Sequence, residues 1–281
     1  MIFTAENEYF TLGVKDSGAE LTSFKSKTTG IEYIWNGNPE IWNGQSPVLF
    51  PVIGRVLDDK YRLNGKEYNM PKHGIVRRKP FTLCDRTENS LTFVIRDTEE
   101  SFAMYPYHFR LFVKYEIKGK SLEVTHTVVN DNDADMLYSF GAHPGFNCKV
   151  GDYLEFECNE TLETERIEEY LTDKKFPVLN NSKKIEITEH IFDNDALIFS
   201  GYKSKKISIK SNDHNRVVNF RIDSPLLGIW AKPGAPYVCL EPWWGIDDGY
   251  EPKKDLSEKR GIMSIKPHCE KSFAWNAEIC E

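Results

Sequence analysis

The chain has 281 residues, of which 28% are charged and 40% are hydrophobic. This composition is typical of a folded globular protein and excludes an intrinsically disordered chain. The formal net charge of −7 argues against a nucleic-acid-binding protein, which would need a basic surface stripe. The longest apolar runs, such as residues 47–53, fall far short of the ~20 residues that cross a bilayer, so no membrane partner is expected.

The first residues and the cysteines indicate the compartment. Residues 1–9 contain two glutamates and lack the apolar segment of a signal peptide. The six cysteines form no C-x-x-C pair and show no regular metal-ligand spacing. A chain of this length does not need disulfides, so free thiols in a reducing compartment are the simpler interpretation. The sequence therefore predicts a soluble, cytoplasmic protein.

Short runs that alternate polar and apolar residues dominate the first half of the chain. Residues 39–59, rich in proline and aromatic residues, interrupt this rhythm. A hairpin is expected over residues 61–70, because Asn64-Gly65 is a strong signal for a two-residue turn. The other strands expected here cover residues 9–14, 18–26, 31–35, 81–86, 91–96, 110–117, 122–130 and 136–141.

The second half continues the pattern after one exception. Residues 160–173 are acidic, and a short helix or an irregular excursion is expected there. The strand over residues 236–241 is expected to end at Glu241, and an acidic loop at residues 247–258. Further strands are expected at residues 152–158, 183–188, 196–199, 206–210, 216–222, 227–231, 262–267 and 271–279.

This pattern predicts an all-β fold. No segment shows a helical period over more than about two turns, and no repeat or linker divides the chain. Fifteen or more short strands at this spacing favour a large antiparallel β-sandwich that forms a single domain over residues 1–281.

Several common catalytic motifs are missing from the sequence. There is no G-x-G-x-x-G for a dinucleotide, no H-E-x-x-H for a metal and no G-x-S-x-G nucleophile elbow. Gly119-Lys120-Ser121 resembles the end of a P-loop, but Lys114 stands where that motif needs glycine. No metal site is predicted.

Four polar residues stand where glycine, proline or aromatic residues break the strand pattern: Arg55, His73, His143 and Glu241. A Gly-Ala pair precedes His143 and a proline follows it, so this imidazole is expected at the lip of a sheet. Glu241 ends an apolar strand, where burial raises the pKa of a carboxyl and makes it a better base. Each residue also has a structural interpretation: an ion pair for Arg55, a tight turn for His73, packing for His143 and solvation for Glu241.

Trp243 and Trp244 follow Glu241 closely. Their indole rings suit the C–H faces of a sugar, although at least one of them is also a candidate for core packing. The remaining histidines are interpreted as structural or solvent-facing: His108, His126, His190, His214 and His268.

Together these stretches resemble the aldose 1-epimerase (galactose mutarotase-like) superfamily, and in particular its bacterial LacX-like branch. The resemblance covers nearly the whole chain and rests on the order and spacing of four motifs. These are Phe50-Pro51-Val52-Ile53-Gly54-Arg55, His73-Gly74-Ile75-Val76-Arg77, Gly141-Ala142-His143-Pro144-Gly145-Phe146 and Cys239-Leu240-Glu241-Pro242-Trp243-Trp244-Gly245.

The resemblance implies a β-supersandwich with a sugar-binding cleft on its concave face. In the family, the histidine that matches His143 is the general acid that protonates the ring oxygen. The glutamate that matches Glu241 is the general base that deprotonates the anomeric hydroxyl. Residues that match Arg55 and His73 hold sugar hydroxyls or the ring oxygen. Arg77 matches an arginine that contacts the phosphate of a sugar 6-phosphate.

The resemblance also implies a ligand-holding aspartate, which we assign to Asp195 with Asp193 as the alternative. Trp243 and Trp244 complete the expected substrate-binding residues. Mutarotation needs one acid and one base and no cofactor. A histidine, with a reference pKa of ~6.5, and a carboxylate can exchange these roles near neutral pH.

The expected function is therefore an aldose 1-epimerase-like enzyme that interconverts the α and β anomers of a hexose or hexose phosphate. The alternative is a non-catalytic carbohydrate-binding protein on the same scaffold, which needs no acid–base pair. A glycoside hydrolase or lyase is less well supported, because hydrolysis usually needs two carboxylates. The expected partner is a small-molecule sugar or sugar phosphate, and the expected state is a monomer or homodimer.

Overall fold

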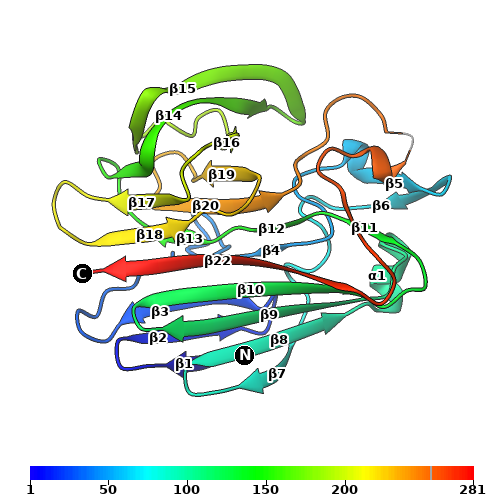
Figure 1. The fold of residues 1–281 in the computed structure, drawn as a ribbon, viewed down its shortest axis with the longest axis horizontal. Coiled ribbons are helices and arrows are strands. Elements are labelled where there is room, and N and C mark those ends of the chain that lie inside the picture. The colour runs from blue at the N-terminus through cyan, green and yellow to red at the C-terminus, as the bar shows by residue number, and fades with distance from the viewer. Residues whose placement is uncertain (254) are drawn as a thin grey trace.

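The structure is a computed structural model that describes residues 1–253 and 255–281, and antiparallel strands dominate it (Figure 1). The first three strands form a small sheet of their own in the order β1-β2-β3. They are β1 (Ile2–Glu6), β2 (Phe10–Lys15) and β3 (Glu20–Ser26).

A 15-stranded sheet contains most of the other strands. Its members are β4 (Val48–Leu49), β7 (Thr82–Arg86), β8 (Ser90–Arg96), β9 (Phe109–Lys118), β10 (Ser121–Asn130), β12 (Phe140–Ala142), β13 (Gly145–Asn147), β14 (Tyr153–Ile167), β15 (Leu171–Glu186), β16 (Leu197–Ser200), β17 (Lys206–Lys210), β18 (Val217–Arg221), β19 (Leu226–Trp230), β20 (Tyr237–Trp244) and β22 (Glu270–Cys280). The order is β4-β12-β20-β19-β16-β14-β17-β18-β22-β10-β9-β8-β7, with β13 also paired to β20 and β15 to β14.

Smaller elements surround this sheet. Two further strand pairs are β5 (Lys60–Leu63) with β6 (Lys66–Asn69) and β11 (Met136–Tyr138) with β21 (Met263–Ile265). The helical elements in the described residues are α1 (Glu99–Met104) and the short 3₁₀ turns η1 (Leu57–Asp59) and η2 (Leu256–Glu258). None of the described helices has the length and apolar character that a membrane crossing requires.

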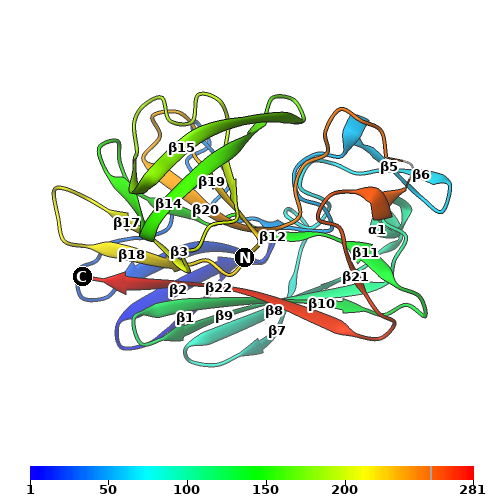
Figure 2. The ribbon, with the colours of Figure 1, turned by 45° about the horizontal axis from the view of Figure 1, so that its top comes forward.

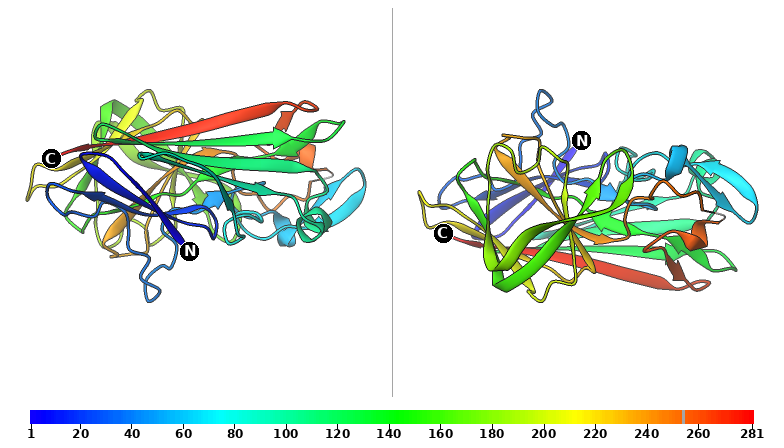
Figure 3. Two further views of the ribbon diagram at one scale, coloured as in Figure 1. Left: turned by 90° about the horizontal axis from the view of Figure 1, so that it is seen from below. Right: turned by 90° about the horizontal axis from the view of Figure 1, so that it is seen from above.

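The hydrophobic core extends through most of the large sheet, and one part of it lies where the β1–β3 sheet packs across β8–β10 (Figure 3). Residues along β9 alternate between buried and partly exposed positions, as expected for strands with one face on a core. The Tyr115 hydroxyl of β9 donates to the Ala19 carbonyl at 2.7 Å, and the Phe3 and Phe93 rings meet at 5.5 Å. Hydrophobic contacts and a buried hydrogen bond therefore join the two layers.

The observed architecture confirms the all-β prediction with its large antiparallel sheets and few short helices. The expected hairpin is also confirmed. Asn64 and Gly65 both have positive φ angles, 52° and 78°, between β5 and β6, as the favoured two-residue turn requires. All six cysteines are free thiols.

Residues 31–35 do not form the expected strand. This segment makes only isolated bridges, Lys25 with Glu32 and Ile34 with Phe146. The side-chain amide of Asn147 donates to the carbonyls of Glu32 and Ile34 at 3.0 and 2.9 Å. A side chain therefore occupies acceptors that the hydrogen bonds of a full strand ladder would use. The expected strand over residues 136–141 is divided into β11 and β12, which belong to different sheets.

The prediction of a helix or irregular excursion at residues 160–173 is wrong. Strand β14 continues to Ile167 and pairs with β15 in a long hairpin, which projects beside β16, β19 and β20 (Figure 2). The predicted end of a strand at Glu241 is also wrong, because β20 continues through Pro242 to Trp244. Glu241 is therefore an interior residue of a strand.

Candidate active site

Strand β20 carries the centre of the candidate site because two short strands pair with it in succession. Gly141 of β12 lies opposite Trp243, and Gly145 of β13 lies opposite Cys239. The two pairings have the same register, although two residues without strand pairing separate β12 from β13. The residues midway between these pairs must therefore also lie opposite each other across the gap.

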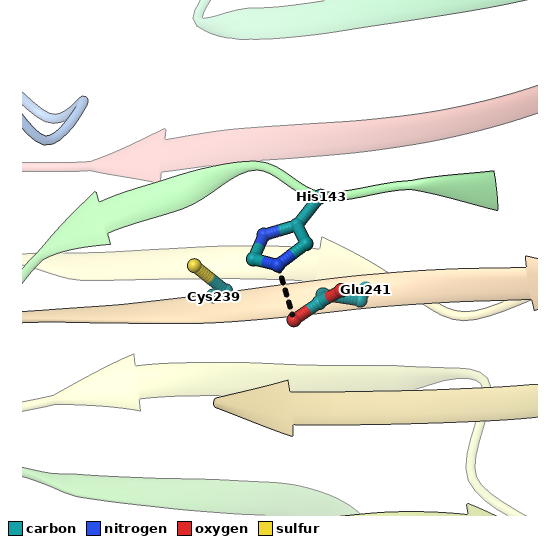
Figure 4. A group of neighbouring side chains, drawn as sticks. All are labelled: His143, Cys239 and Glu241. Carbon is teal, nitrogen blue, oxygen red and sulfur yellow. Dashed lines mark ion pairs between the residues drawn. The ribbon is translucent and has the colours of Figure 1, made fainter. Parts of the chain in front are cut away.

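Those opposed residues are His143 and Glu241. The amide of Leu240 donates to the carbonyl of Pro144 at 3.1 Å, which makes the neighbouring pair a hydrogen-bonded one. His143 and Glu241 consequently occupy a non-hydrogen-bonded position, where opposed side chains approach most closely. The His143 Nε2 atom lies 3.2 Å from Glu241 Oε1 (Figure 4).

Burial controls the ionisation of this pair. His143 is 8% exposed and Glu241 is 1% exposed. Burial lowers the pKa of His143 to about 3, and the charges of Lys72 and Arg77 act in the same direction. Burial raises the pKa of Glu241 well above its ordinary value, although a hydrogen bond from Trp243 opposes the shift. Each group therefore favours its uncharged form, and together they hold one proton near neutral pH.

Three tryptophans fix the position of the pair. Trp243 Nε1 donates to Glu241 Oε2 at 3.1 Å, so that oxygen has its own partner while Oε1 faces His143. The Trp42 ring lies 5.1 Å from the His143 ring, and the Trp230 ring meets it edge-on at 5.7 Å. The imidazole therefore has little freedom to rotate away from the carboxyl.

A cavity of about 610 Å³ opens above the pair. This volume suits a small-molecule ligand such as a monosaccharide. Residues from separate parts of the chain line it: Lys72, His73, Arg77, His143, Arg166, Ile167, Glu168, Phe192, Asp193, Asn194, Asp195, Ala196, Trp230, Lys232, Pro233, Glu241, Trp243 and Asp247.

His73 lies at the cavity with its ring edge-on to His143, the two centroids 6.0 Å apart. The Gly54 amide donates to His73 Nδ1 at 3.1 Å, and the His73 amide donates to the Gly54 carbonyl at 2.7 Å. Because Nδ1 accepts a hydrogen bond, the neutral ring carries its proton on Nε2. Burial and the nearby His143 lower the pKa of His73 well below its ordinary value. His73 can therefore donate one N–H to a ligand without adding charge.

Four basic side chains line the cavity and have no ion-pair partner among the described residues: Lys72, Arg77, Arg166 and Lys232. Burial lowers the pKa of Arg77, and the neighbouring Arg78 adds to this effect. A guanidinium is still fully charged at neutral pH after such a shift. The cavity can thus offer several cationic groups to an anionic ligand, Lys72 and Arg77 among them.

Both candidate aspartates line the cavity, but their surroundings differ. Asp193 is exposed, and its carboxylate lies 2.9 Å from His190 Nδ1. Asp195 has a positive φ of 69°, and its negative charge contributes to the raised pKa values of both Glu241 and Asp247. Asp195 is therefore the better placed of the two to face a ligand above Glu241.

The structure does not bring Arg55 or Trp244 to the cavity. The Arg55 guanidinium pairs with Asp59 at 3.4 Å and is 38% exposed, while its backbone amide donates to Asp247 and its charge contributes to the lowered pKa of His73. Trp244 points to the opposite face of β20, where its ring lies 4.8 Å from that of Phe273. Side chains alternate along a strand, so Trp243 and Trp244 cannot both face the ligand.

Comparison with known proteins identifies the family of this chain. The family model described as aldose 1-epimerase matches residues 1–254. The chain belongs to the aldose 1-epimerase family.

Individual members of the aldose 1-epimerase family resemble this chain over nearly its whole length. The chromosomal protein LacX of Lactococcus lactis subsp. lactis is 33% identical over 95% of each chain. A galactose mutarotase related enzyme from Lactobacillus acidophilus is 33% identical, with a TM-score of 0.95 over 100% of this chain and 98% of that one. A galactose mutarotase-like protein from Lactobacillus casei is 29% identical, with a TM-score of 0.90 over 100% of both chains.

Asp247 also lines the cavity, although the sequence analysis did not predict it as a site residue. Asp247 is 3% exposed and accepts the Arg55 amide at 2.9 Å. Burial raises the pKa of its carboxyl. Gly54 makes room for it, because a Cβ at this position, where φ is +65°, would overlap the Asp247 carboxylate. No local pattern around Asp247 indicates this long-range contact.

Trp230 and Lys72 also line the cavity and were not singled out from the sequence. For Trp230 a signal was present. Trp230 is the last residue of a strand, and a proline follows shortly after it, in Lys232-Pro233-Gly234. His143 likewise stands at a strand end and precedes a proline. Lys72 directly precedes His73, and a lysine beside a turn carries no comparable signal.

Proposed function

We propose that this protein is an aldose 1-epimerase that interconverts the α and β anomers of a hexose or hexose phosphate. The observation that carries the proposal is the pair formed by His143 and Glu241. Their polar atoms are 3.2 Å apart, both side chains are buried, and both line one cavity large enough for a monosaccharide. A base and an acid that share one proton are what anomerisation requires.

The proposed reaction moves two protons in opposite directions. The shared proton first moves from Glu241 to His143. Glu241 then takes the proton of the anomeric hydroxyl, while His143 gives the shared proton to the ring oxygen, and the C1–O5 bond breaks. Rotation about the C1–C2 bond turns the aldehyde, and closure on its other face returns both protons. The pair carries one proton in total before and after ring opening. No external acid, base or cofactor is consumed.

The other cavity residues would hold the sugar during the rotation. Trp243 and Trp230 offer apolar ring surfaces to its C–H faces. Asp195 and Asp247 can accept hydrogen bonds from hydroxyls, and His73 can donate one. The unpaired cations Lys72 and Arg77 support a phosphorylated substrate in addition to a neutral hexose.

Polarimetry tests this function directly. Freshly dissolved α-glucose, α-galactose and their 6-phosphates should reach anomeric equilibrium faster with the wild-type protein than in buffer. His143→Ala and Glu241→Ala should each lower the rate by about 10²–10⁴-fold, because each removes one positioned proton-transfer group. Circular dichroism should show that both variants remain folded.

A suitable control is Trp244→Phe, which alters the strand of Glu241 on its opposite face and should leave the rate almost unchanged. A wild-type protein that binds these sugars but anomerises none of them above the rate in water would contradict the proposal. That result would instead favour a non-catalytic carbohydrate-binding protein.

A further inference from the structure

A third side chain lies beside the proposed acid–base pair and takes no part in the mechanism above. Cys239 precedes Glu241 by two residues on β20, so both side chains project from the same face of the strand. Cys239 is fully buried and has a free thiol. One ligand atom from each of His143, Cys239 and Glu241 lies within 4.8 Å of the other two (Figure 4).

The distances suit a tetrahedral metal ion. Ligand atoms around a zinc ion are separated by about 3.3–3.6 Å, given metal–ligand bonds of about 2.0–2.3 Å. The separation of His143 Nε2 and Glu241 Oε1, 3.2 Å, is close to the lower end of this range. The sulfur lies within 4.8 Å of the other two ligand atoms and must approach them by up to about 1.5 Å, through rotation about the Cα–Cβ bond of Cys239.

Two further features support a ligand at this position. The Nδ1 atom of His143 is buried and has no hydrogen-bond partner, so no protein acceptor fixes which ring nitrogen carries the proton, and Nε2 can be the unprotonated nitrogen that a metal ion needs. Trp243 binds the outer oxygen of Glu241 and so orients the carboxyl toward the other two groups. Orienting hydrogen bonds of this kind are a regular feature of metal sites. His143 and Glu241 line the cavity, from which water can reach an ion bound between them, whereas Cys239 does not line it.

We propose that His143, Cys239 and Glu241 form a binding site for a thiophilic divalent ion such as Zn²⁺, and that the bound ion switches off the acid–base pair. Imidazole, thiolate and carboxylate together form a typical zinc ligand set. The ion replaces the thiol proton and the proton that His143 and Glu241 share. Two positive charges therefore enter as two protons leave, and the buried site gains no net charge.

Binding itself can be tested without reference to catalysis. Co²⁺ is added under anaerobic conditions to the full-length protein in a buffer that does not bind metals. One equivalent should produce the near-ultraviolet thiolate-to-cobalt charge-transfer band and the visible bands of a tetrahedral ion, and Zn²⁺ should abolish both. Cys239→Ala should lose the charge-transfer band, whereas Cys148→Ala should keep it.

Cys239→Ser gives a second test with a side chain of nearly the same size, in case the alanine variant does not fold. It should also lack the charge-transfer band. The proposal is overturned if the wild type shows no such band, or if the band persists undiminished in a folded Cys239 variant. Either result is independent of whether the protein epimerises sugars.

The inhibitory part of the proposal rests on the proposed function and has its own measurement. Zn²⁺ should stop anomerisation by the wild type, and a chelator should restore it. Each protein's rate is compared with its own metal-free rate. Cys239→Ser should need more than about 100-fold more Zn²⁺ than the wild type for half-inhibition. Losing even a group that only orients a metal ligand lowers metal affinity by about 10–100-fold, and the loss of a ligand should cost more. Equal inhibition of both proteins would show that the thiol is not a ligand.

Discussion

At the scale of single residues, the shared proton of His143 and Glu241 makes the pH dependence informative. At low pH the pair takes up a second proton when the pH approaches the lowered pKa of His143, about 3. At high pH it loses the shared proton when the pH exceeds the raised pKa of Glu241. Between these limits kcat/KM should be flat, because the pair keeps its single proton. We expect no loss of kcat/KM between pH 7 and pH 5.

Polarimetric rates from pH 4 to pH 9, corrected for spontaneous mutarotation at each pH, test this expectation. A histidine with an ordinary pKa of 6.5 would instead be mostly protonated at pH 5 and would lower the active fraction about 30-fold. An acid limb centred near pH 6.5 would therefore show that His143 is not held in its uncharged form by burial.

A second prediction at this scale concerns Arg77 and the choice between a neutral and a phosphorylated sugar. A hydrogen bond to a charged group contributes about 1.5–3 kcal/mol, which corresponds to a change in KM of about 10–100-fold. Arg77→Met should raise KM for glucose 6-phosphate by this factor and change KM for glucose little. The control is Arg78→Met, since Arg78 is exposed and lies outside the cavity. Equal effects of Arg77→Met on both substrates would exclude a phosphate contact.

At the scale of elements, two prolines explain why the sequence indicated the position of the site but not the bounds of the strands around it. Pro144 interrupts the strand that pairs with β20, as predicted, and leaves His143 between β12 and β13. The sequence predicts a strand that ends at Glu241, yet β20 continues through Pro242 to Trp244. A proline removes one amide from a ladder, and neighbours on both sides can hold a strand through that loss. With β20 continued to Trp244, simple alternation already places Trp243 at the site and Trp244 in the core.

The β14–β15 hairpin shows where strand prediction fails for a physical reason. The pairing of these strands contains several register shifts between Glu155 and Ile167. Each bulge moves the following side chains to the other face, so the period of two that marks a strand is lost. By contrast, β9 and β10 pair without a shift, and their alternation was readable directly from the sequence.

The loop that presents Asp247 depends on a buried ion pair. Lys259 Nζ lies 2.9 Å from Asp248 Oδ1 and donates to the Ile246 carbonyl at 2.6 Å, and both charged side chains are almost fully buried. The other Asp248 oxygen accepts the Leu57 amide at 3.2 Å. This pair therefore ties the loop after β20 to the turn that follows Gly54.

Lys259→Met should destabilise the protein by about 3–5 kcal/mol, because it leaves the buried Asp248 carboxylate without its counter-ion. The double variant Lys259→Met with Asp248→Leu should recover much of that loss, since no unpaired buried charge remains. Urea unfolding of the three proteins measures both effects. A loss below about 1 kcal/mol in the single variant would show that water reaches Asp248 and that the pair does not hold the loop.

At the scale of the whole molecule, the order of the large sheet bears on the prediction of a single domain. Strand β22, close to the C-terminus, lies between β18 and β10. On one side of it are strands from residues 82–130, and on the other are strands from residues 140–244 together with β4. If the chain were divided at any one point between these two groups, at least one strand would be separated from a strand with which it pairs.

We therefore expect the chain to unfold as one cooperative unit. Five of the six tryptophans lie on the β20 side of the sheet, at residues 35, 42, 230, 243 and 244, so fluorescence reports mainly on that side. Far-ultraviolet circular dichroism reports on all strands. The two signals should give coincident urea transitions, as two-state unfolding requires. A separate loss of circular dichroism while tryptophan fluorescence stays native would instead show that β7–β10 unfold on their own, and the single-domain prediction would be wrong.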